Sequence, residues 1–91
     1  AGPAAQLRSS DRRLAMTMFT SYPGLQVYSG NYLDGARDRN GRTYAAHAGI
    51  ALEPQYFPDS PNHPHWPQPD CVLRPGERRT HFIRLCFSDG E

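Results

Sequence analysis

Lysine is absent from this 91-residue chain, and arginine supplies all ten positive charges against nine Asp and Glu residues. The net charge of +1 gives no overall attraction to nucleic acid or to an anionic membrane surface. No apolar run approaches the roughly 18 residues of a membrane-spanning helix, so we expect no membrane partner. The start, A-G-P-A-A-Q-L-R, lacks the charged and apolar regions of a secretory signal, and none is expected.

Cysteine is also scarce, because Cys71 and Cys86 are the only two in the chain. They are too few for a disulfide framework. A single bridge between them stays open as an alternative to two buried free thiols in a reducing compartment such as the cytoplasm, which we expect. Four histidines are present without a C-x-x-C or H-E-x-x-H pattern, and Pro64 separates His63 from His65. We therefore expect no metal site.

Short runs with a period of two dominate the apolar pattern. Residues 14–20, L-A-M-T-M-F-T, carry apolar side chains on both faces, as a strand inside a sandwich does. Further strands are predicted over residues 4–8, 25–29, 49–53 and 80–87. No run predicts a helix of convincing length, and there is no internal repeat. The sequence therefore predicts an all-β fold with long loops.

Seven of the nine prolines lie between Pro54 and Pro75. A stretch of this length without secondary structure is uncommon in a compact domain, and it is normally either functional or disordered. Three large apolar side chains argue against disorder, namely Tyr56, Phe57 and Trp66. We expect an ordered loop that wraps over a larger body.

The predicted strands are too few to form a good isolated fold. Five short strands leave sheet edges open, and a chain of this size buries only about 60–65% of its unfolded surface. We therefore expect residues 1–91 to be the C-terminal part of a single longer β domain. The remainder of that domain would supply partner strands.

Glu53 is the residue most suggestive of chemistry. Along G-I-A-L-E, bulky Ile50 and Leu52 point one way, whereas Gly49, Ala51 and Glu53 point the other way. A carboxylate beside two very small side chains leaves volume above the sheet for a ligand, and it suits a general base. The alternative is a glutamate at a strand end that points into water.

Gln26 is a polar residue in an otherwise apolar strand, and it shares its direction with Tyr28. An amide offers both an acceptor and donors, the combination that sugar hydroxyls require. A solvent-facing glutamine on a half-exposed strand is the alternative. The arginines between Arg37 and Arg42 stand beside aspartates, which favours a solvated charged loop.

At these residues the chain resembles a known family. Four motifs occur in the order and at the spacing found in aldose 1-epimerases, the galactose mutarotases: P-G-L-Q-V-Y-S-G-N (23–31), A-G-I-A-L-E-P-Q (48–55), F-P-D-S-P-N-H-P (57–64) and V-L-R-P-G-E (72–77). The resemblance runs from about residue 15 to residue 87. It covers only the C-terminal third or so of a family member.

The resemblance implies a galactose-mutarotase-like β-sandwich, or supersandwich, that is incomplete in this chain. It implies an isomerase that interconverts the α and β anomers of galactose and glucose without a metal or organic cofactor. The family's L-E motif places the catalytic base at Glu53, and its P-G-x-Q motif places a sugar-binding amide at Gln26. The acid histidine would lie outside residues 1–91, so we expect the chain alone to be inactive.

Three other functions stay open on the sequence. In the first alternative, the parent protein is a related epimerase acting on sugar phosphates, with arginines from the loop between Arg37 and Arg42 in its pocket. A second alternative is a carbohydrate-binding β module without catalysis, with a surface formed by Gln26, Tyr28 and Trp66. In the third, the chain only completes a sandwich, and its large aromatic residues are core anchors.

Overall fold

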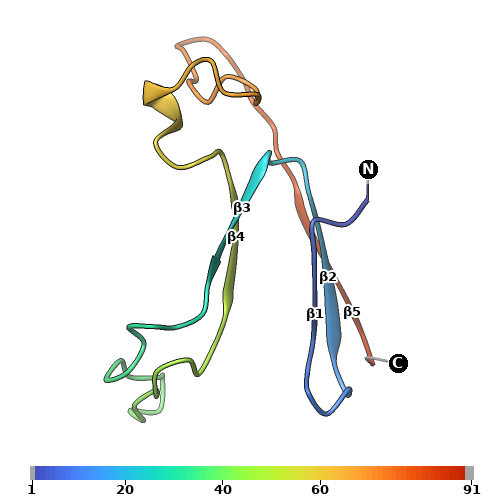
Figure 1. The fold of residues 1–91 in the computed structure, drawn as a ribbon, viewed down its shortest axis with the longest axis vertical. Coiled ribbons are helices and arrows are strands. Elements are labelled where there is room, and N and C mark those ends of the chain that lie inside the picture. The colour runs from blue at the N-terminus through green and yellow to red at the C-terminus, as the bar shows by residue number, and fades with distance from the viewer. Residues whose placement is uncertain (1, 90–91) are drawn as a thin grey trace.

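The computed structural model describes residues 2–89 and confirms the predicted all-β fold (Figure 1). Its strands are β1 (Ala5–Arg8), β2 (Ala15–Thr20), β3 (Gly24–Tyr28), β4 (Ala51–Gln55) and β5 (Ile83–Ser88). The helical content of this part of the chain is one 3-10 turn, η1 (Ser60–Asn62). No helix formed by residues 2–89 has the length and apolar character needed to cross a bilayer.

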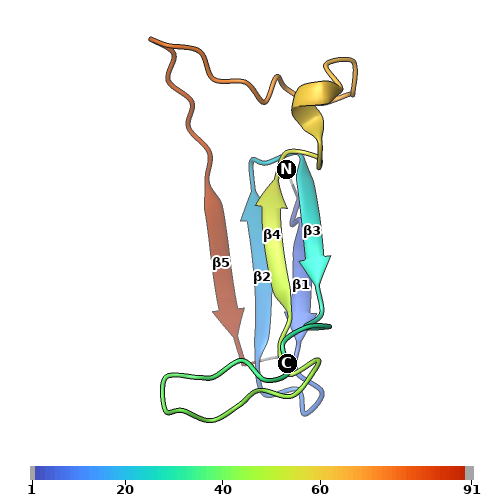
Figure 2. The same cartoon turned by 90° about the vertical axis from the view of Figure 1, so that its left-hand side faces the viewer.

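The strands form two antiparallel sheets. One has the order β1-β2-β5, and the other is the pair β3-β4. Figure 1 shows the two sheets side by side, converging where β2 leads into β3. Turned by 90° in Figure 2, β3 and β4 lie in front of β1 and β2, while β5 stands to one side. This two-layer arrangement is consistent with part of a β-sandwich.

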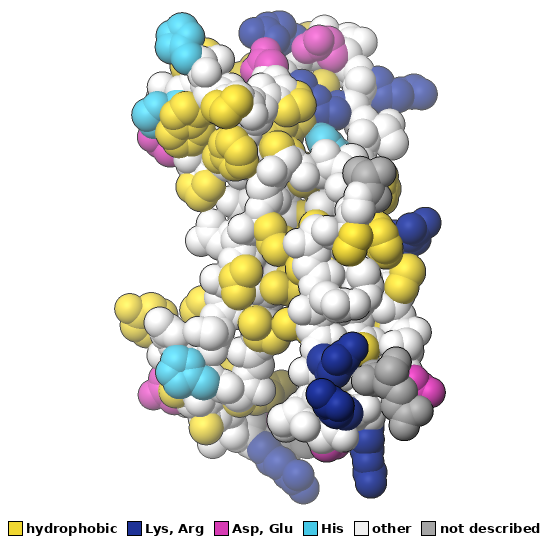
Figure 3. Space-filling view, turned by 45° about the vertical axis from the view of Figure 1, so that its right-hand side comes forward, with side chains coloured by type: hydrophobic (Ala, Val, Ile, Leu, Met, Phe, Trp, Pro, Cys, Tyr) yellow, Lys and Arg dark blue, Asp and Glu magenta, His cyan; other side chains and the backbone are white. Residues whose placement is uncertain are grey.

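Burial is concentrated on β2, the central strand of the larger sheet. Ala15 and Met18 are 6% and 4% exposed, and their odd spacing puts them on opposite faces of that strand. This agrees with the prediction of apolar side chains on both faces. In contrast, all six residues of β5 are exposed, including Ile83, Leu85 and Phe87. In Figure 3, apolar side chains are open to the surface on the side turned forward. An apolar strand left uncovered indicates a sheet that is made to pack against further structure.

The predicted burial of both thiols was wrong. Cys71 and Cys86 are both free, Cys86 is exposed and Cys71 is only half-buried. The reason lies in the sheet, because Cys86 sits on β5, which nothing within residues 2–89 covers. The pattern of the strand predicted a covering layer, and no such layer is formed by residues 2–89.

The predicted boundaries of β4 were shifted. We expected a strand over residues 49–53 that ended before Pro54, whereas β4 runs from Ala51 to Gln55 with Pro54 opposite Leu25. Proline has no N–H to donate to a ladder, and it is tolerated mainly in edge strands. β4 is an edge strand of a two-stranded sheet, so the proline does not end it.

Candidate functional site

The β3–β4 hairpin brings together the two residues that the sequence singled out. The register places Gln26 directly opposite Glu53. Opposed residues of antiparallel strands point to the same face, with Cβ atoms about 4.5–5.5 Å apart. Both side chains are exposed. The hairpin therefore carries an amide and a carboxylate side by side, and we call this surface the Gln26–Glu53 face.

A second amide extends this row. Gln55 Nε2 donates a long hydrogen bond of 3.4 Å to Gln26 Oε1. Because that bond uses the amide oxygen of Gln26, the NH₂ group of Gln26 stays available to donate to a ligand. The Gln26–Glu53 face thus offers amide donors beside a carboxylate acceptor. Such a mixture can bind vicinal hydroxyl groups.

Two hollows lie toward the two ends of the hairpin. One, of about 340 Å³, is lined in part by Tyr28, Gly49 and Ala51. The other, of about 160 Å³, is lined in part by Gln26 and Phe57. Gly49 and Ala51 line one of these hollows, but neither hollow is the ligand volume that we expected beside the Glu53 carboxylate. Glu53 lines neither hollow and faces solvent in this chain, because the two-stranded hairpin has no further strand beside it to build a wall.

Gly24 allows Phe57 to lie next to Gln26. A Cβ atom on Gly24 would come within 2.8 Å of Phe57 Cδ1 and within 3.2 Å of the Gln55 carbonyl oxygen. Real Cβ atoms do not approach other atoms so closely, so a side chain here would displace the aromatic ring. The glycine of the P-G-L-Q motif is thus explained by close packing on the hairpin.

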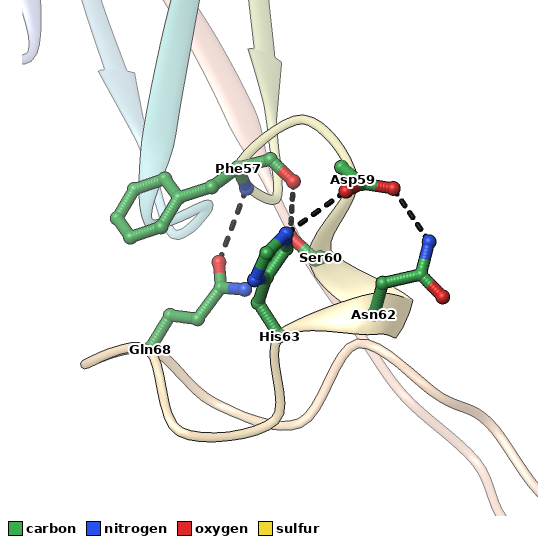
Figure 4. A network of polar contacts seen from close by, with 6 residues as sticks. All are labelled: Phe57, Asp59, Ser60, Asn62, His63 and Gln68. Carbon is green, nitrogen blue, oxygen red and sulfur yellow. Dashed lines mark hydrogen bonds and ion pairs between the residues drawn. The ribbon is translucent and has the colours of Figure 1, made fainter.

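The proline-rich segment makes polar contacts within itself (Figure 4). Gln68 Oε1 accepts a hydrogen bond from the Phe57 N–H at 3.1 Å, and Gln68 Nε2 donates to Ser60 Oγ at 2.7 Å. The buried Ser60 hydroxyl donates in turn to the Phe57 carbonyl oxygen. Gln68 therefore holds Phe57, which follows β4, against η1.

Asp59 and His63 stabilise the same segment. Asp59 has a positive φ of 65° and accepts hydrogen bonds from Asn62 Nδ2 at 2.6 Å and His63 Nε2 at 2.9 Å. The Asn62 amide, and after it His63, hold the pKa of the Asp59 carboxyl below its usual value. The His63 ring stacks on Trp66 with centroids 4.0 Å apart. His63 therefore stabilises the conformation of this loop. Within residues 2–89, no three His, Cys, Asp or Glu side chains are grouped to hold a metal ion.

Two residues of the connection between β3 and β4, His47 and Asp38, have local partners. His47 has a positive φ of 63°, and its Nδ1 donates to the Ser29 carbonyl oxygen at 2.9 Å. Asp38 Oδ1 accepts from the backbone N–H groups of Asn40 and Arg42, which closes the Asn-Gly turn of that exposed loop. Both contacts order the connection between β3 and β4, and neither reaches the Gln26–Glu53 face.

Sequence reasoning missed His81, which contacts Tyr22 and Tyr56 between the two sheets. Its only local signal is its place just before the last strand. The residues that it contacts lie far away along the chain, so no short pattern could have indicated them.

The fold and the site together define an all-β protein with a carboxylate and amides on one sheet face. Residues 1–86 match the aldose 1-epimerase family, and the chain therefore belongs to that family. This result confirms the family resemblance found in the motifs.

Named relatives agree with the family match. The chain is 54% identical over 84 residues to an aldose 1-epimerase of Escherichia coli (strain K12), a match that covers 92% of this chain and 24% of the relative. It is 46% identical over 85 residues to an aldose 1-epimerase of Haemophilus influenzae, covering 93% and 25%. A galactose mutarotase of Mus musculus is 40% identical over 85 residues, covering 92% and 24%.

The chain spans about a quarter of the length of these curated relatives. No solved structure matches it significantly. The family is therefore established from sequence, whereas the activity of a whole protein has to be argued from the site.

Proposed function

We propose that this chain forms the C-terminal part of an aldose 1-epimerase that interconverts the α and β anomers of free aldoses such as galactose and glucose. The observation that carries the proposal is the pairing of Gln26 with Glu53 on adjacent strands, in a chain that belongs to this family. The uncovered β5 and the two-stranded hairpin support a larger fold. In that fold, the remainder of the same β-sandwich would cover them and form the wall of the sugar site.

Glu53 is proposed as the general base. In this proposal its carboxylate takes the proton from the anomeric hydroxyl. An acid outside this chain, a histidine by family resemblance, gives a proton to the ring oxygen as the C1–O bond breaks. The open aldehyde rotates about C1–C2 and closes on its other face, and the acid and base exchange roles. Each positioned proton transfer contributes about 10²–10⁴-fold to such a reaction.

Gln26 is proposed as a sugar-binding residue. Its NH₂ group has no acceptor within residues 2–89, and it lies on the face of the proposed base. Hydrogen bonds from this group to sugar hydroxyls would orient the ring so that the anomeric hydroxyl reaches Glu53. The isolated chain is expected to bind sugar weakly and to be inactive, because the acid is missing.

A chimera tests the proposed function. Residues 1–91 replace the matching segment of the Escherichia coli aldose 1-epimerase, and polarimetry follows the mutarotation of freshly dissolved α-galactose and α-glucose. Acceleration well above the uncatalysed rate is expected. A chimera that folds, as judged by cooperative thermal unfolding, and binds galactose without accelerating mutarotation would contradict the proposal and favour a carbohydrate-binding module. Faster turnover of glucose 6-phosphate than of galactose would favour an epimerase of sugar phosphates.

Replacing Gln26 by methionine should weaken substrate binding in this chimera. The change keeps the length of the side chain and removes its hydrogen bonds, each worth about 0.5–1.5 kcal/mol net, so KM should rise roughly tenfold while kcat changes less. Gln6→Met is the matched control, because Gln6 is also an exposed glutamine on a strand, bonded to Thr17. Equal KM values for the two variants would remove Gln26 from the site.

A further inference from the structure

An aromatic cluster joins the two sheets away from the Gln26–Glu53 face. It consists of Tyr22, which precedes β3, Tyr56, which follows β4, and His81, which precedes β5. The His81 ring stacks on Tyr22 with centroids 3.9 Å apart and planes 13° apart. Tyr56 meets both rings edge-on, at 5.8 Å from Tyr22 and 5.5 Å from His81. We call these three residues the joint cluster.

Hydrogen bonds fix the orientation of the His81 ring. Its Nδ1 lies 2.9 Å from Ser21 Oγ, and its Nε2 lies 2.9 Å from the Tyr56 hydroxyl. The Phe82 N–H donates to the same Ser21 Oγ at 3.0 Å, so the serine hydroxyl can give its own hydrogen to Nδ1. The His81 Nε2 pairs with the Tyr56 hydroxyl, so both ring nitrogens are used.

The joint cluster holds one end of the site hairpin. Gly24 pairs with Gln55 at that end, and Tyr22 and Tyr56 lie just outside the two strands next to this pair. Gln26 is two residues beyond Gly24, and Glu53 is two residues before Gln55. The cluster therefore links the site hairpin to the three-stranded sheet through side-chain contacts.

We propose that His81 is a positioning residue for this site. By holding Tyr56 through a hydrogen bond and Tyr22 through stacking, it sets the place of the Gln26–Glu53 face relative to the rest of the fold. The Arg79 guanidinium, 5.5 Å from the centre of the Tyr56 ring, supports the same tyrosine from another side. The inference rests on the proposed function, because it assigns His81 a role in the reaction proposed for Glu53.

Small displacements of a catalytic base are costly, since a misplacement of about 1 Å can lower a rate by about 100-fold. Two residues separate Tyr56 from Glu53, so a loosened Tyr56 would cause a smaller displacement at Glu53. We expect Tyr56→Phe and His81→Phe each to lower kcat about tenfold in the chimera, with a smaller change in KM. The double variant should lose no more than the worse single variant, because both single variants remove the same hydrogen bond between Tyr56 and His81.

A conservative variant and two controls separate positioning from general damage. His81→Gln keeps an Nε2 donor toward Tyr56 and should recover most of kcat, although it loses the stacked ring. Tyr32→Phe removes a hydroxyl from a tyrosine that is 86% exposed, and His65→Phe changes an exposed histidine of the proline-rich segment. Both controls should keep kcat within twofold of the parent chimera.

The outcomes distinguish the two proposals. A chimera that folds but does not catalyse mutarotation defeats the proposed function, and His81 loses its role with it. An active chimera in which Tyr56→Phe and His81→Phe lower the melting temperature but leave kcat and KM unchanged overturns the positioning role alone. Additive losses of kcat in the double variant would also overturn the positioning role. If His81→Phe does not fold, Tyr56→Phe decides, since it removes a single oxygen atom.

Discussion

Replacing Glu53 by glutamine lowers kcat for mutarotation by about 10²–10⁴-fold in the chimera, while KM for galactose stays within a few-fold. Glutamine has the same shape as glutamate but cannot accept a proton at neutral pH. The loss should therefore fall on proton transfer rather than on folding. The side chain is exposed on an edge strand and makes no hydrogen bond within the described chain, so the exchange disturbs no packing. Polarimetry gives the rate, and thermal unfolding should give an unchanged melting temperature.

Glu77 provides the control for this change. Glu77 Oε1 accepts a hydrogen bond from the Arg74 N–H at 2.7 Å, in the turn that leads toward β5. Glutamine preserves that acceptor, so Glu77→Gln should retain full activity. Near-normal mutarotation by the Glu53→Gln chimera would show that another group is the base. The assignment of the whole site would then have to be abandoned.

Replacing Gly30 by alanine should destabilise the chimera by about 2–4 kcal/mol, which sums a strained backbone and a forced displacement of neighbours. Gly30 is buried and has a φ of 82°, a conformation that other residues rarely adopt. A Cβ atom there would also lie 3.0 Å from the Gly49 carbonyl oxygen and 3.2 Å from the backbone of His47. Backbone atoms cannot move aside as a flexible side chain does. Chemical denaturation followed by circular dichroism measures the change.

Gly35 is a matched control for Gly30. Its φ of 86° is almost the same, but a Cβ atom there would meet nothing within 4 Å. Gly35→Ala should therefore cost only the strain of a left-handed alanine, about 1–2 kcal/mol. The difference between the two variants measures the close approach of the segments around residues 30 and 49. Equal losses of stability would mean that this approach contributes nothing.

Gly30 and Gly49 both line the larger of the two hollows, at the Tyr28 end of the hairpin. A displacement there should also affect sugar binding if the proposed function holds. The Gly30→Ala chimera is thus expected to raise KM for galactose, whereas Gly35→Ala should not. A loss of stability and a rise in KM in the same variant would show that the packing of the β3–β4 connection also shapes the sugar site.

Local patterning was enough to predict that five strands exist, but not all of their bounds. The period of two in residues 14–20 predicted β2 within one residue of its observed start, and the alternation around Leu25 and Val27 predicted β3. The same reasoning misplaced β4, because it treated Pro54 as a strand end. Whether a proline ends a strand depends on whether it lies at an edge, and local sequence does not contain that information.

The sequence by itself determined which residues are polar in apolar strands, where turns fall and to which family the motifs belong. Only the tertiary structure decided that Gln26 stands opposite Glu53, that the thiol of Cys86 is open to solvent, and that His81 joins Tyr22 to Tyr56. The physical reason is the range of the interactions. Alternation and turn preference act between neighbours along the chain, whereas register, burial and ring contacts depend on which distant segments meet.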